Sequence, residues 1–436
     1  MKPLKVALLG CGTVGSEVVT RILTHPQAFR DRIGAELEIS AVAVRDAAKD
    51  RPGVPRELLT TDTAAAIEGA DVVVELMGGI EPARDRILTA LGNGSSVVTA
   101  NKALLAADFE RLVGAADAAG VRLEFEAAAA AAIPIVRPLT DSLAGDRVTR
   151  VMGIVNGTTN YILDQMEKEG WSFDHALRTA QELGYAEADP TADVGGHDAA
   201  AKAAILSSLA FHTPVGIDDV HVEGITSITS DTIATAASQG FSIKLLAICE
   251  RLEDSPAGSG VSARVYPALI PRAHVLSGVA GAFNAVFVES ELAGELMFYG
   301  QGAGGAPTAS AVLGDIVSVA RRRVLGGRGQ FEHGSAAALP VLGIDAISTR
   351  YQITLEVDDR SGVLSQVTDV FAAEDISIEL VQQTGLPPLD GEEVSTRAKL
   401  VVATHTATEA DLRRTVDRLA DLDVVRSLTS VLRIEG

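Results

Sequence analysis

Two ionisable residues, Asp198 and Lys202, lie one helical turn apart at the start of an alanine-rich helical pattern. Side chains four residues apart share one face of a helix, and the small apolar neighbours of Lys202 predict that this face is buried. Burial removes the hydration that favours an ammonium group and lowers its pKa. A lysine in this state can donate a proton near neutral pH, with Asp198 orienting it. The alternative is an exposed ion pair on a helix surface.

The loop before this helix is rich in acidic residues, with Glu187 and Asp193 preceding His197. No second histidine stands at helical ligand spacing and no cysteine is near, which argues against zinc. A GxSxG nucleophile motif is also missing from the sequence. Cys11 lies within a glycine loop and Cys249 within an apolar run, so neither has the setting of a nucleophile. We therefore expect acid–base chemistry in this segment.

A second chemical motif is GCGTVG at residues 10–15, which ends an apolar strand pattern and begins a helix pattern. This GxGxxG spacing within a β-α-β pattern is typical of dinucleotide-binding loops. Gly10 allows the tight turn, Gly12 lets the pyrophosphate approach backbone N–H groups, and Gly15 lets helix and strand pack closely. The alternative is a glycine turn without a ligand. The residues predicted to bind the cofactor here are Gly10, Gly12, Thr13, Val14 and Gly15.

The second strand pattern ends in Arg45 and Asp46. A carboxylate at this position suits the ribose 2′-hydroxyl of NAD, whereas an arginine suits the 2′-phosphate of NADP. Because Arg45 stands at the strand end, we predict NADP as the cofactor, and Asp46 leaves NAD possible. The alternative for Arg45 is an ordinary surface charge.

Polar residues also follow the fourth strand pattern, where Thr99, Asn101 and Lys102 come directly after SSVV. The carboxyl ends of parallel strands border the ligand crevice, so these side chains are expected to face cofactor or substrate. The alternative is a helix cap followed by an exposed lysine. Residues 156–160 begin another helix after a strand, and they line the same site if that strand also ends there.

The elements that position these residues alternate between short β-rich runs and helical patterns over the first 130 residues. This alternation predicts a parallel sheet covered by helices, the Rossmann-type α/β arrangement. The strand patterns are LKVALLG (4–10), EISAVAV (38–44), ADVVVELMG (70–78), SSVVTA (95–100) and VRLEFEA (121–127).

A mixed α+β region follows, opened by a strand pattern at 147–155. Helical patterns cover about 159–183 and 198–211, and a glycine-rich stretch at 300–320 leads into another helix. Further β-like segments are 219–225, 241–250, 262–270 and 285–292. The last 86 residues show the order βαββαβ, which is the ferredoxin-like arrangement.

The composition limits the partners and the compartment. The net charge of -21 argues against nucleic acids and anionic membrane surfaces. No apolar run approaches about 18 residues, so we expect no transmembrane helix. Two cysteines make no disulfide framework and fit a reducing cytoplasm.

Six stretches together resemble the homoserine dehydrogenase family in its long form with a C-terminal ACT domain. They are GCGTVG, VVVELMGG, TANKALLA, VMGIVNGTTNYIL, LGYAEADPTADVGGHDAAAKAAIL and GQGAGGAPTASAVLGDI, and the likeness runs from end to end. The resemblance implies reversible reduction of L-aspartate 4-semialdehyde to L-homoserine with NADPH or NADH, in threonine, methionine and isoleucine biosynthesis.

The resemblance also implies roles for individual residues. Lys202 is similar to the proton donor to the aldehyde oxygen, and Asp198 to its partner on the substrate side. Glu187 resembles the carboxylate that holds the substrate ammonium, which Asp193 joins. Lys102 resembles a lysine near cofactor and substrate, while Gly302 resembles the glycine of a late loop that returns to the cofactor.

The family further has a sodium-type site, which the resemblance places at the alanine run. The matching positions are Glu126 and the carbonyls of Ala129, Ala131 and Ile133. Oxygen ligands suit a hard cation. Ala131 stands where glycine is common and adopts a positive φ less readily. We expect a strand to about Ala127, a turn with exposed carbonyls, and a helix with Pro134 in its first turn.

The C-terminal segment resembles an ACT domain, which implies an amino-acid effector, here threonine, although Ser361 stands where proline is common. A homodimer or homotetramer is also implied. One alternative is a non-catalytic amino-acid sensor on a Rossmann scaffold. An aspartate-semialdehyde dehydrogenase would need a catalytic cysteine, for which neither cysteine is placed.

The predicted organisation has four parts. Residues 1–135 form the dinucleotide-binding Rossmann domain, completed by about 300–320. Residues 136–300 form the substrate-binding and dimerisation domain, 321–349 a linker, and 350–436 the ACT regulatory domain.

Overall fold

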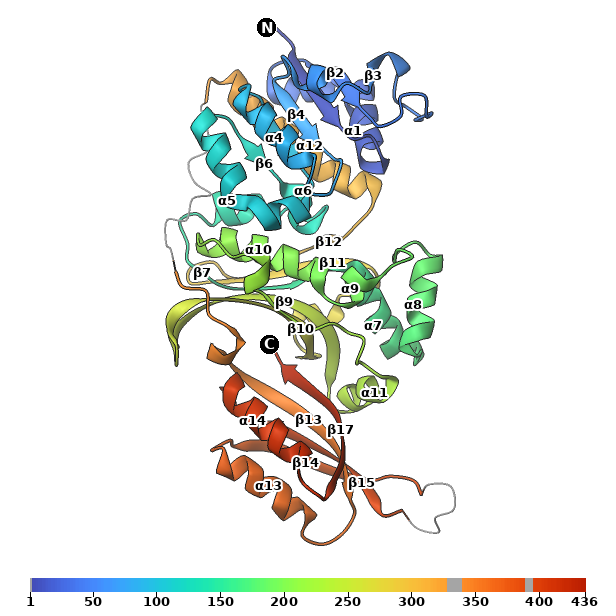
Figure 1. Cartoon of the computed structure of the whole chain (residues 1–436), viewed down its shortest axis with the longest axis vertical. Helices are drawn as coiled ribbons and strands as arrows, with labels where there is room; N and C mark the ends of the chain where they lie inside the picture. The colour runs from blue at the N-terminus through green and yellow to red at the C-terminus, as the bar shows by residue number, and fades with distance from the viewer. Residues whose placement is uncertain (1, 328–338, 389–394) are drawn as a thin grey trace.

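The computed structural model describes residues 2–327, 339–388 and 395–436. In Figure 1 an N-terminal α/β unit, a curved sheet with helices and a C-terminal unit follow one another along the long axis. No described helix has both the length and the apolar character needed to span a bilayer.

Six strands of the described chain form the N-terminal parallel sheet in the order β3-β2-β1-β4-β5-β6. This confirms the predicted Rossmann-type fold. The central strands are buried on both faces, which explains their continuous apolar sequences. The strands are β1 (Leu4–Leu9), β2 (Leu37–Ala43), β3 (Leu59–Thr60), β4 (Val72–Glu75), β5 (Ser96–Thr99) and β6 (Leu123–Glu124).

Helices cover both faces of this sheet, and one of them comes from a distant part of the chain. Helix α12 (Gly305–Val324) packs against α1 and contacts β4 and β5, as the orange helix among blue elements shows in Figure 1. The late segment therefore returns to the N-terminal unit. The other helices here are α1 (Thr13–Thr24), α2 (Pro26–Ile33), α3 (Thr63–Ile67), α4 (Ala83–Gly92) and α5 (Lys102–Ala119), with a 3-10 turn at Arg56–Leu58.

The alanine run differs from its prediction. Strand β6 ends at Glu124, and Glu126–Ala130 form the short helix α6, so a strand to Ala127 is wrong. Pro134 also lies ahead of the next helical residues, which begin at Val136 and pass into a π-helical turn at Pro138–Ser142. The high helix propensity of alanine prevails once β6 has ended.

The middle region is a strongly curved, mainly antiparallel sheet with helices on one face (Figure 1). The predicted helix at 159–183 is two helices, because Gly170 adopts φ +67° after the first and Ser172 caps the second. The helices are α7 (Gly157–Glu169), α8 (Phe173–Glu182), α9 (Thr191–Val194), α10 (His197–Phe211) and α11 (Ser230–Ser238). The strands are β7 (Val148–Ile154), β8 (His221–Val222), β9 (Phe241–Ser255), β10 (Gly258–Pro271), β11 (Phe283–Ser290) and β12 (Gly294–Gln301), with 3-10 turns at Ile217–Asp219 and Val275–Gly278. These strands pair with one another antiparallel except for β8, which pairs in parallel with β10.

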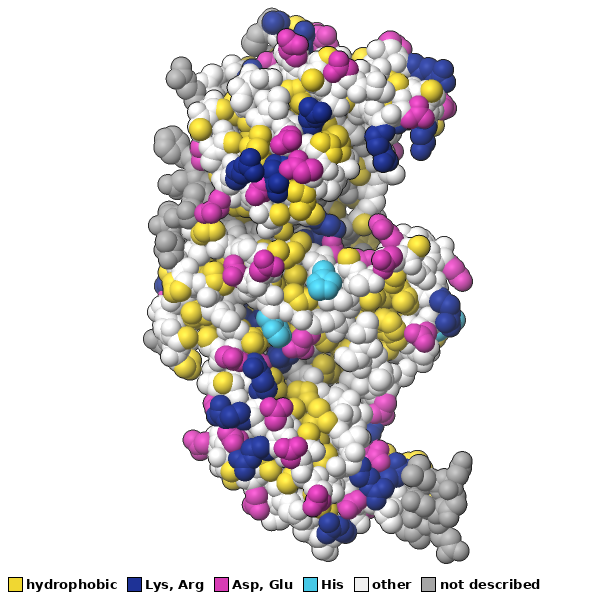
Figure 2. Space-filling view, in the orientation of Figure 1, with side chains coloured by type: hydrophobic (Ala, Val, Ile, Leu, Met, Phe, Trp, Pro, Cys, Tyr) yellow, Lys and Arg dark blue, Asp and Glu magenta, His cyan; other side chains and the backbone are white. Residues whose placement is uncertain are grey.

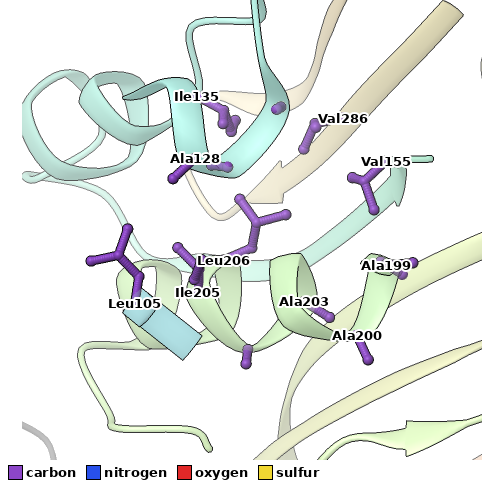
Figure 3. Packing of buried hydrophobic residues seen from close by; sticks show 14 of the residues in the cluster. Leu105, Ala128, Ile135, Val155, Ala199, Ala200, Ala203, Ile205, Leu206 and Val286 are labelled. Carbon is purple, nitrogen blue, oxygen red and sulfur yellow. The ribbon is translucent and has the colours of Figure 1, made fainter. Parts of the chain in front are cut away.

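Helix α10 is buried along almost its whole length between this sheet and the N-terminal unit. In Figure 3 its Leu206 points toward Ala128 and Ile135, and Val155 lies near its first turn at Ala199. One hydrophobic cluster thus runs continuously from the N-terminal sheet through α10 into the middle sheet.

The C-terminal unit has the ferredoxin-like order β17-β13-β15-β14, with its own hydrophobic cluster. Strand β17 also pairs in parallel with β10, so eleven strands of the described chain belong to one continuous sheet. The elements are β13 (Ser348–Asp358), α13 (Val363–Ala373), β14 (Ile378–Gly385), β15 (Arg397–Thr404), β16 (Ala407–Thr408), α14 (Glu409–Ala420) and β17 (Val425–Ile434), preceded by a 3-10 turn at Ile344–Ala346.

Buried charges cross the junction between β17 and the middle sheet. Glu435 accepts from the Tyr266 hydroxyl at 2.5 Å and pairs with Arg150 of β7. Arg264 of β10 donates to Tyr266 at 2.9 Å and to Glu250 at 2.7 Å. The end of the C-terminal unit is therefore tied to the strand that leads to Val155.

Candidate active site

The carboxylate of Asp198 binds two lysines from different parts of the chain. The Lys202 ammonium donates to Asp198 Oδ2 at 2.8 Å and to the Val155 carbonyl at 2.6 Å. The Lys102 ammonium pairs with the other oxygen, Asp198 Oδ1. The predicted acid–base pair is therefore in contact, and Lys102 joins it.

Three elements bring these side chains together. Asp198 and Lys202 lie on the first two turns of α10, just after Gly196. Gly196 adopts φ +84°, and a Cβ there would lie 3.1 Å from Val222, so the turn into α10 favours glycine. Lys102 is the first residue of α5 directly after β5, and Val155 directly follows β7.

The two lysines differ in exposure. The side chain of Lys202 is 10% exposed, whereas that of Lys102 is 47% exposed. Burial lowers the pKa of Lys202, and the nearby Asp198 carboxylate opposes this shift. Lys202 is therefore a buried ammonium that loses a proton more readily than an ordinary lysine, and Lys102 lies at the open side of the pair.

The acidic groups are shifted in opposite directions. Burial alone would raise the pKa of Asp198, but Lys202 and Lys102 outweigh burial and hold this pKa well below its usual range. Burial raises the pKa of Asp193, and a hydrogen bond from Asn156 partly offsets the effect. Asp198 is thus a fixed negative charge between two ammonium groups.

Asn156 connects the carboxylates of Asp193 and Asp198. The sequence pattern indicated only the segment 156–160 and not this residue. Its amide nitrogen donates to Asp193 Oδ1 at 2.7 Å and to Asp198 Oδ2 at 2.9 Å. Its amide oxygen accepts from the Thr159 N–H at 2.9 Å and caps α7. The sequence signal that could have identified Asn156 was an asparagine that follows a strand and precedes a helix.

Glu187 lies apart from this cluster. Its side chain is exposed in the loop after α8, and no described residue of the cluster bonds to its carboxylate. Its backbone carbonyl accepts from the Gln181 side chain at 3.1 Å. The substrate-binding role of Glu187 stays a prediction.

The glycine loop has the shape that a dinucleotide site needs. Gly10 adopts φ +98°, and a Cβ there would lie 2.6 Å from the Leu76 carbonyl oxygen. A Cβ at Gly15 would lie 2.7 Å from the Gly10 carbonyl oxygen, whereas the space around Gly12 is open. The loop therefore packs tightly on its inner side and leaves its outer side at Gly12 free for a pyrophosphate.

The late glycine-rich loop lies against the first. A Cβ at Gly305 would lie 2.6 Å from the Thr13 methyl carbon, and Gly302 packs against the Asn284 side chain. Figure 2 shows a notch at the side of the molecule, between the N-terminal unit and the middle region. The late segment therefore lies beside the first glycine loop, and the cofactor contact of Gly302 stays a prediction.

Arg45 is exposed shortly after β2, the strand that pairs with β1. Arg51 was not predicted, yet its guanidinium donates to the Cys11 carbonyl at 3.0 Å and to the Asp46 and Lys49 carbonyls at 2.9 Å each. The sequence feature that could have identified Arg51 was a basic residue shortly after the second strand.

Thr99 and Asn101 have partners within the N-terminal sheet. The Thr99 hydroxyl donates to Glu75 at 2.6 Å, and the Asn101 side chain caps α5 by accepting from the Leu104 N–H. Glu75 was also missed, although a carboxylate at the end of an apolar strand was visible in the sequence.

The Glu126 carboxylate is fully engaged by the chain. Its oxygens accept from the N–H groups of Ile135 at 2.6 Å, Val136 at 2.7 Å and Arg137 at 3.2 Å, and Arg137 adds an ion pair at 3.1 Å. Glu126 therefore anchors the start of the next helix. Ala131 has φ +50°, the positive value that its alanine side chain disfavours.

The chain matches two family models, described as "Homoserine dehydrogenase, NAD binding domain" over residues 10–126 and "Homoserine dehydrogenase" over residues 134–317. It is 58% identical to the homoserine dehydrogenase of Mycobacterium leprae, covering 99% of this chain and 97% of that one. It is 52% identical to that of Corynebacterium glutamicum, covering 99% and 95%.

Solved structures agree with this similarity. A homoserine dehydrogenase from Thiobacillus denitrificans superposes with a TM-score of 0.92 at 37% identity, covering 100% of this chain and 99% of that one. The Staphylococcus aureus homoserine dehydrogenase gives 0.77 at 32% identity, with complete coverage of both. The chain belongs to the homoserine dehydrogenase family of NAD(P)-dependent oxidoreductases.

Proposed function

We propose that Lys202, Asp198 and Lys102 form the catalytic centre for the interconversion of L-aspartate 4-semialdehyde and L-homoserine. The observation that carries this assignment is the single carboxylate of Asp198 holding both ammonium groups. Full-length relatives named homoserine dehydrogenase at 52–58% identity favour this enzyme over a non-catalytic sensor.

The chain's own groups supply the proton chemistry. When bound, a nicotinamide cofactor supplies or accepts the hydride. Negative charge develops on the aldehyde oxygen during reduction, and the buried Lys202 ammonium stabilises it and donates a proton from Nζ. Asp198 orients Lys202 through Oδ2 and retains Lys102 through Oδ1. In the oxidative direction neutral Lys202 accepts the proton from the hydroxyl.

Glu187 and Asp193 are the proposed carboxylates for the substrate ammonium. Asp193 already lies beside Asp198 through the shared amide of Asn156. The exposed position of Glu187 lets the loop after α8 approach a substrate from the solvent side.

An assay with homoserine and NADP, then NAD, tests the catalytic assignment through absorbance of the reduced nicotinamide. Lys202→Ala should lower kcat by about 100-fold or more, as loss of a general acid–base group does. Lys168→Ala is the matched control, because Lys168 makes a similar ion pair with Asp164 on α7 but is 53% exposed. Wild-type turnover in Lys202→Ala would contradict the assignment.

We further propose a preference for NADP through Arg45, with Gly10, Gly12, Thr13, Val14, Gly15, Thr99 and Gly302 around the cofactor. Arg51 contributes by holding the segment after β2 against the glycine loop. Arg45→Ala should raise the KM for NADP and leave that for NAD nearly unchanged. An equal change in both would contradict a 2′-phosphate role.

The alanine run suits a monovalent cation, probed here as sodium. Among the described residues, none donates a hydrogen bond to the carbonyls of Ala129, Ala131 or Ile133. These oxygens are the donor type that hard cations take, while the Glu126 carboxylate fixes the turn that presents them. Replacing sodium by choline at constant ionic strength should lower activity. An unchanged rate would exclude a catalytic need for the cation.

The C-terminal unit is proposed as an ACT domain that binds threonine and lowers activity. Its ferredoxin-like order and its link through Glu435 to β7 support a regulatory role. Rate measurements with threonine, and with alanine as the control amino acid, test it. No change in rate or assembly would contradict threonine control.

We also propose a homodimer or homotetramer in the cytoplasm. The edge strand β12 exposes Met297 and Tyr299, and Tyr299 stacks on Phe283 of β11 at 5.1 Å between ring centroids. Apolar groups on a sheet edge favour association with a second copy. Sedimentation of the wild type and of Tyr299→Asp tests this, and a wild-type monomer would contradict it.

A further inference from the structure

We propose that Glu75 is a positioning residue that sets the location of Lys102 by tying the loops after β4 and β5 together. The proposal rests on the catalytic assignment of Lys102 above. Glu75 is a buried carboxylate that forms no hydrogen bond or ion pair with Lys102 or Asp198 among the described residues.

Glu75 ends β4 and is fully buried, after three apolar residues in the same strand. Its Oε1 accepts from the Met77 N–H at 2.7 Å and from the Gly78 N–H at 3.1 Å. No Lys, Arg or His in the described ranges forms an ion pair with it. Three hydrogen bonds from neutral groups therefore satisfy this carboxylate, and two of them fold the loop after β4 back onto it.

The third hydrogen bond reaches the neighbouring strand. Thr99 ends β5, and its hydroxyl donates to Glu75 Oε2 at 2.6 Å. The same hydroxyl oxygen accepts from the Asn101 N–H at 3.1 Å. Because Lys102 follows Asn101 directly, the carboxylate of Glu75 fixes the backbone immediately before Lys102.

Asn101 closes the connection from the other side. Its side-chain nitrogen donates to the Gly79 carbonyl at 2.6 Å, and its side-chain oxygen accepts from the Leu104 N–H at 3.2 Å. The two loops are thus joined once through Glu75 and once through Asn101. This closed set of hydrogen bonds holds the first turn of α5 at the carboxyl end of the sheet.

The arrangement matters because packing does little to hold Lys102. Its side chain is 47% exposed, yet its ammonium must meet Asp198 on α10, 96 residues later in the chain. A misplacement of about 1 Å can lower a rate by about 100-fold. The backbone before Lys102 therefore needs a fixed position, and Glu75 provides it.

The test measures whether Glu75 acts through Lys102. Glu75→Gln keeps the size of the side chain but replaces one carboxylate oxygen by an NH2 group, so a single oxygen can no longer accept both from the Thr99 hydroxyl and from the Met77 and Gly78 N–H groups. Thr99→Val removes the donor. Each should lower kcat/KM for homoserine by about 10- to 100-fold. In a Lys102→Ala background, Glu75→Gln should add less than about a threefold loss, because its effect no longer has Lys102 to act on.

Thr99→Ser keeps the hydroxyl and should recover most of the activity that Thr99→Val loses. Asp71→Asn is the matched control, since Asp71 precedes β4 and accepts from the Lys5 N–H at the other end of the sheet. It should leave kcat/KM near the wild-type value. Thermal unfolding of every variant separates a loss of activity from a loss of folding.

The proposal would be overturned if the loss of kcat/KM in the Glu75→Gln, Lys102→Ala double variant equalled the product of the losses in the two single variants. A loss in Asp71→Asn equal to that in Glu75→Gln would also overturn it. If Glu75→Gln does not fold, the Thr99→Val, Lys102→Ala pair gives the same comparison. A wild-type protein that does not oxidise homoserine would instead defeat the proposed function, and titration with NADPH would still report cofactor binding.

Discussion

The Asn156 amide nitrogen lies 2.9 Å from Asp198 Oδ2, the same oxygen that receives the Lys202 ammonium. Asn156 thus shares in orienting the acid–base pair while it also caps α7. A substitution that keeps the helix cap but removes the hydrogen bond to Asp198 can separate these two roles of Asn156.

Asn156→Ser should retain the helix cap, because serine is a good N-cap residue, but its hydroxyl is too short to reach both carboxylates. We expect kcat/KM to fall about 10- to 100-fold with little change in Tm. The control is Ser172→Ala, which removes the cap of α8 and should cost about 1 kcal/mol without loss of activity. Full activity in Asn156→Ser would show that Asp193 and Asp198 need no shared donor.

The pH dependence should move in a defined direction when Asp198 is neutralised. Asp198 raises the pKa of Lys202 against the effect of burial, so Asp198→Asn should lower that pKa further. Aldehyde reduction needs protonated Lys202, so its rate should fall at a lower pH in the variant. Homoserine oxidation needs neutral Lys202, so its rise should also begin at a lower pH.

Full pH profiles of kcat/KM in both directions check this shift. Asp231→Asn serves as the control, because Asp231 is an exposed carboxylate on α11 that pairs with Lys399. A shift of the Asp198→Asn profile to higher pH would contradict Lys202 as the proton donor.

Ala131→Gly should stabilise the protein. Unfavourable backbone conformations cost about 1–3 kcal/mol, and a new glycine costs about 0.4–1 kcal/mol in unfolded-state entropy. The net expectation is a gain of about 1 kcal/mol in the free energy of unfolding. Ala130→Gly, one residue earlier but within α6, should instead destabilise by at least about 1 kcal/mol. Chemical denaturation of both variants decides the comparison, and destabilisation by both would show that Ala131 is unstrained.

Glu435→Ala should destabilise strongly, by about 3–5 kcal/mol, because it leaves Arg264, Arg150 and Tyr266 without their shared acceptor. Glu379→Ala breaks an exposed pair with Arg350 in the same unit and should cost about 0–1 kcal/mol. Equal Tm values for the two variants would contradict a structural role for Glu435.

The same carboxylate links stability to pH. Burial alone would raise the pKa of Glu435, but Arg264 and Arg150 outweigh burial and lower it. Its contribution is therefore present above the unfolded pKa and is lost as the pH falls through the folded pKa. The wild type should lose stability on acidification more steeply than Glu435→Ala does.

Local sequence patterns were sufficient for much of this molecule. Apolar strands separated by helical patterns predicted the parallel sheet, and the alanine-rich surroundings of Lys202 predicted its burial. In both cases the signal lies within one element, where hydrophobic periodicity reports directly on packing. The order of the C-terminal elements was equally plain.

Contacts between elements far apart in the chain could not be predicted from local sequence patterns. Lys102 and Asp198 meet only because β5 and α10 are brought together by the whole fold. The carboxylates of Glu75 and Glu126 accept hydrogen bonds from backbone N–H groups, and no residue spacing in the sequence predicts such partners. The two-residue strands β3 and β6 are too short to show a period.

The pairing of β17 with β10 also bears on how the chain acquires its structure. Ala268 and Leu269 of β10 pair with Arg433 and Ile434 of β17. This part of the β10 edge therefore stays without its β17 partner until the segment between the two strands has been synthesised. Pairings so far apart in sequence form slowly, and an open strand edge invites association with other chains in the meantime. We expect refolding to include a late, concentration-sensitive phase in which the C-terminal unit docks, observable as a slow recovery of activity after dilution from denaturant.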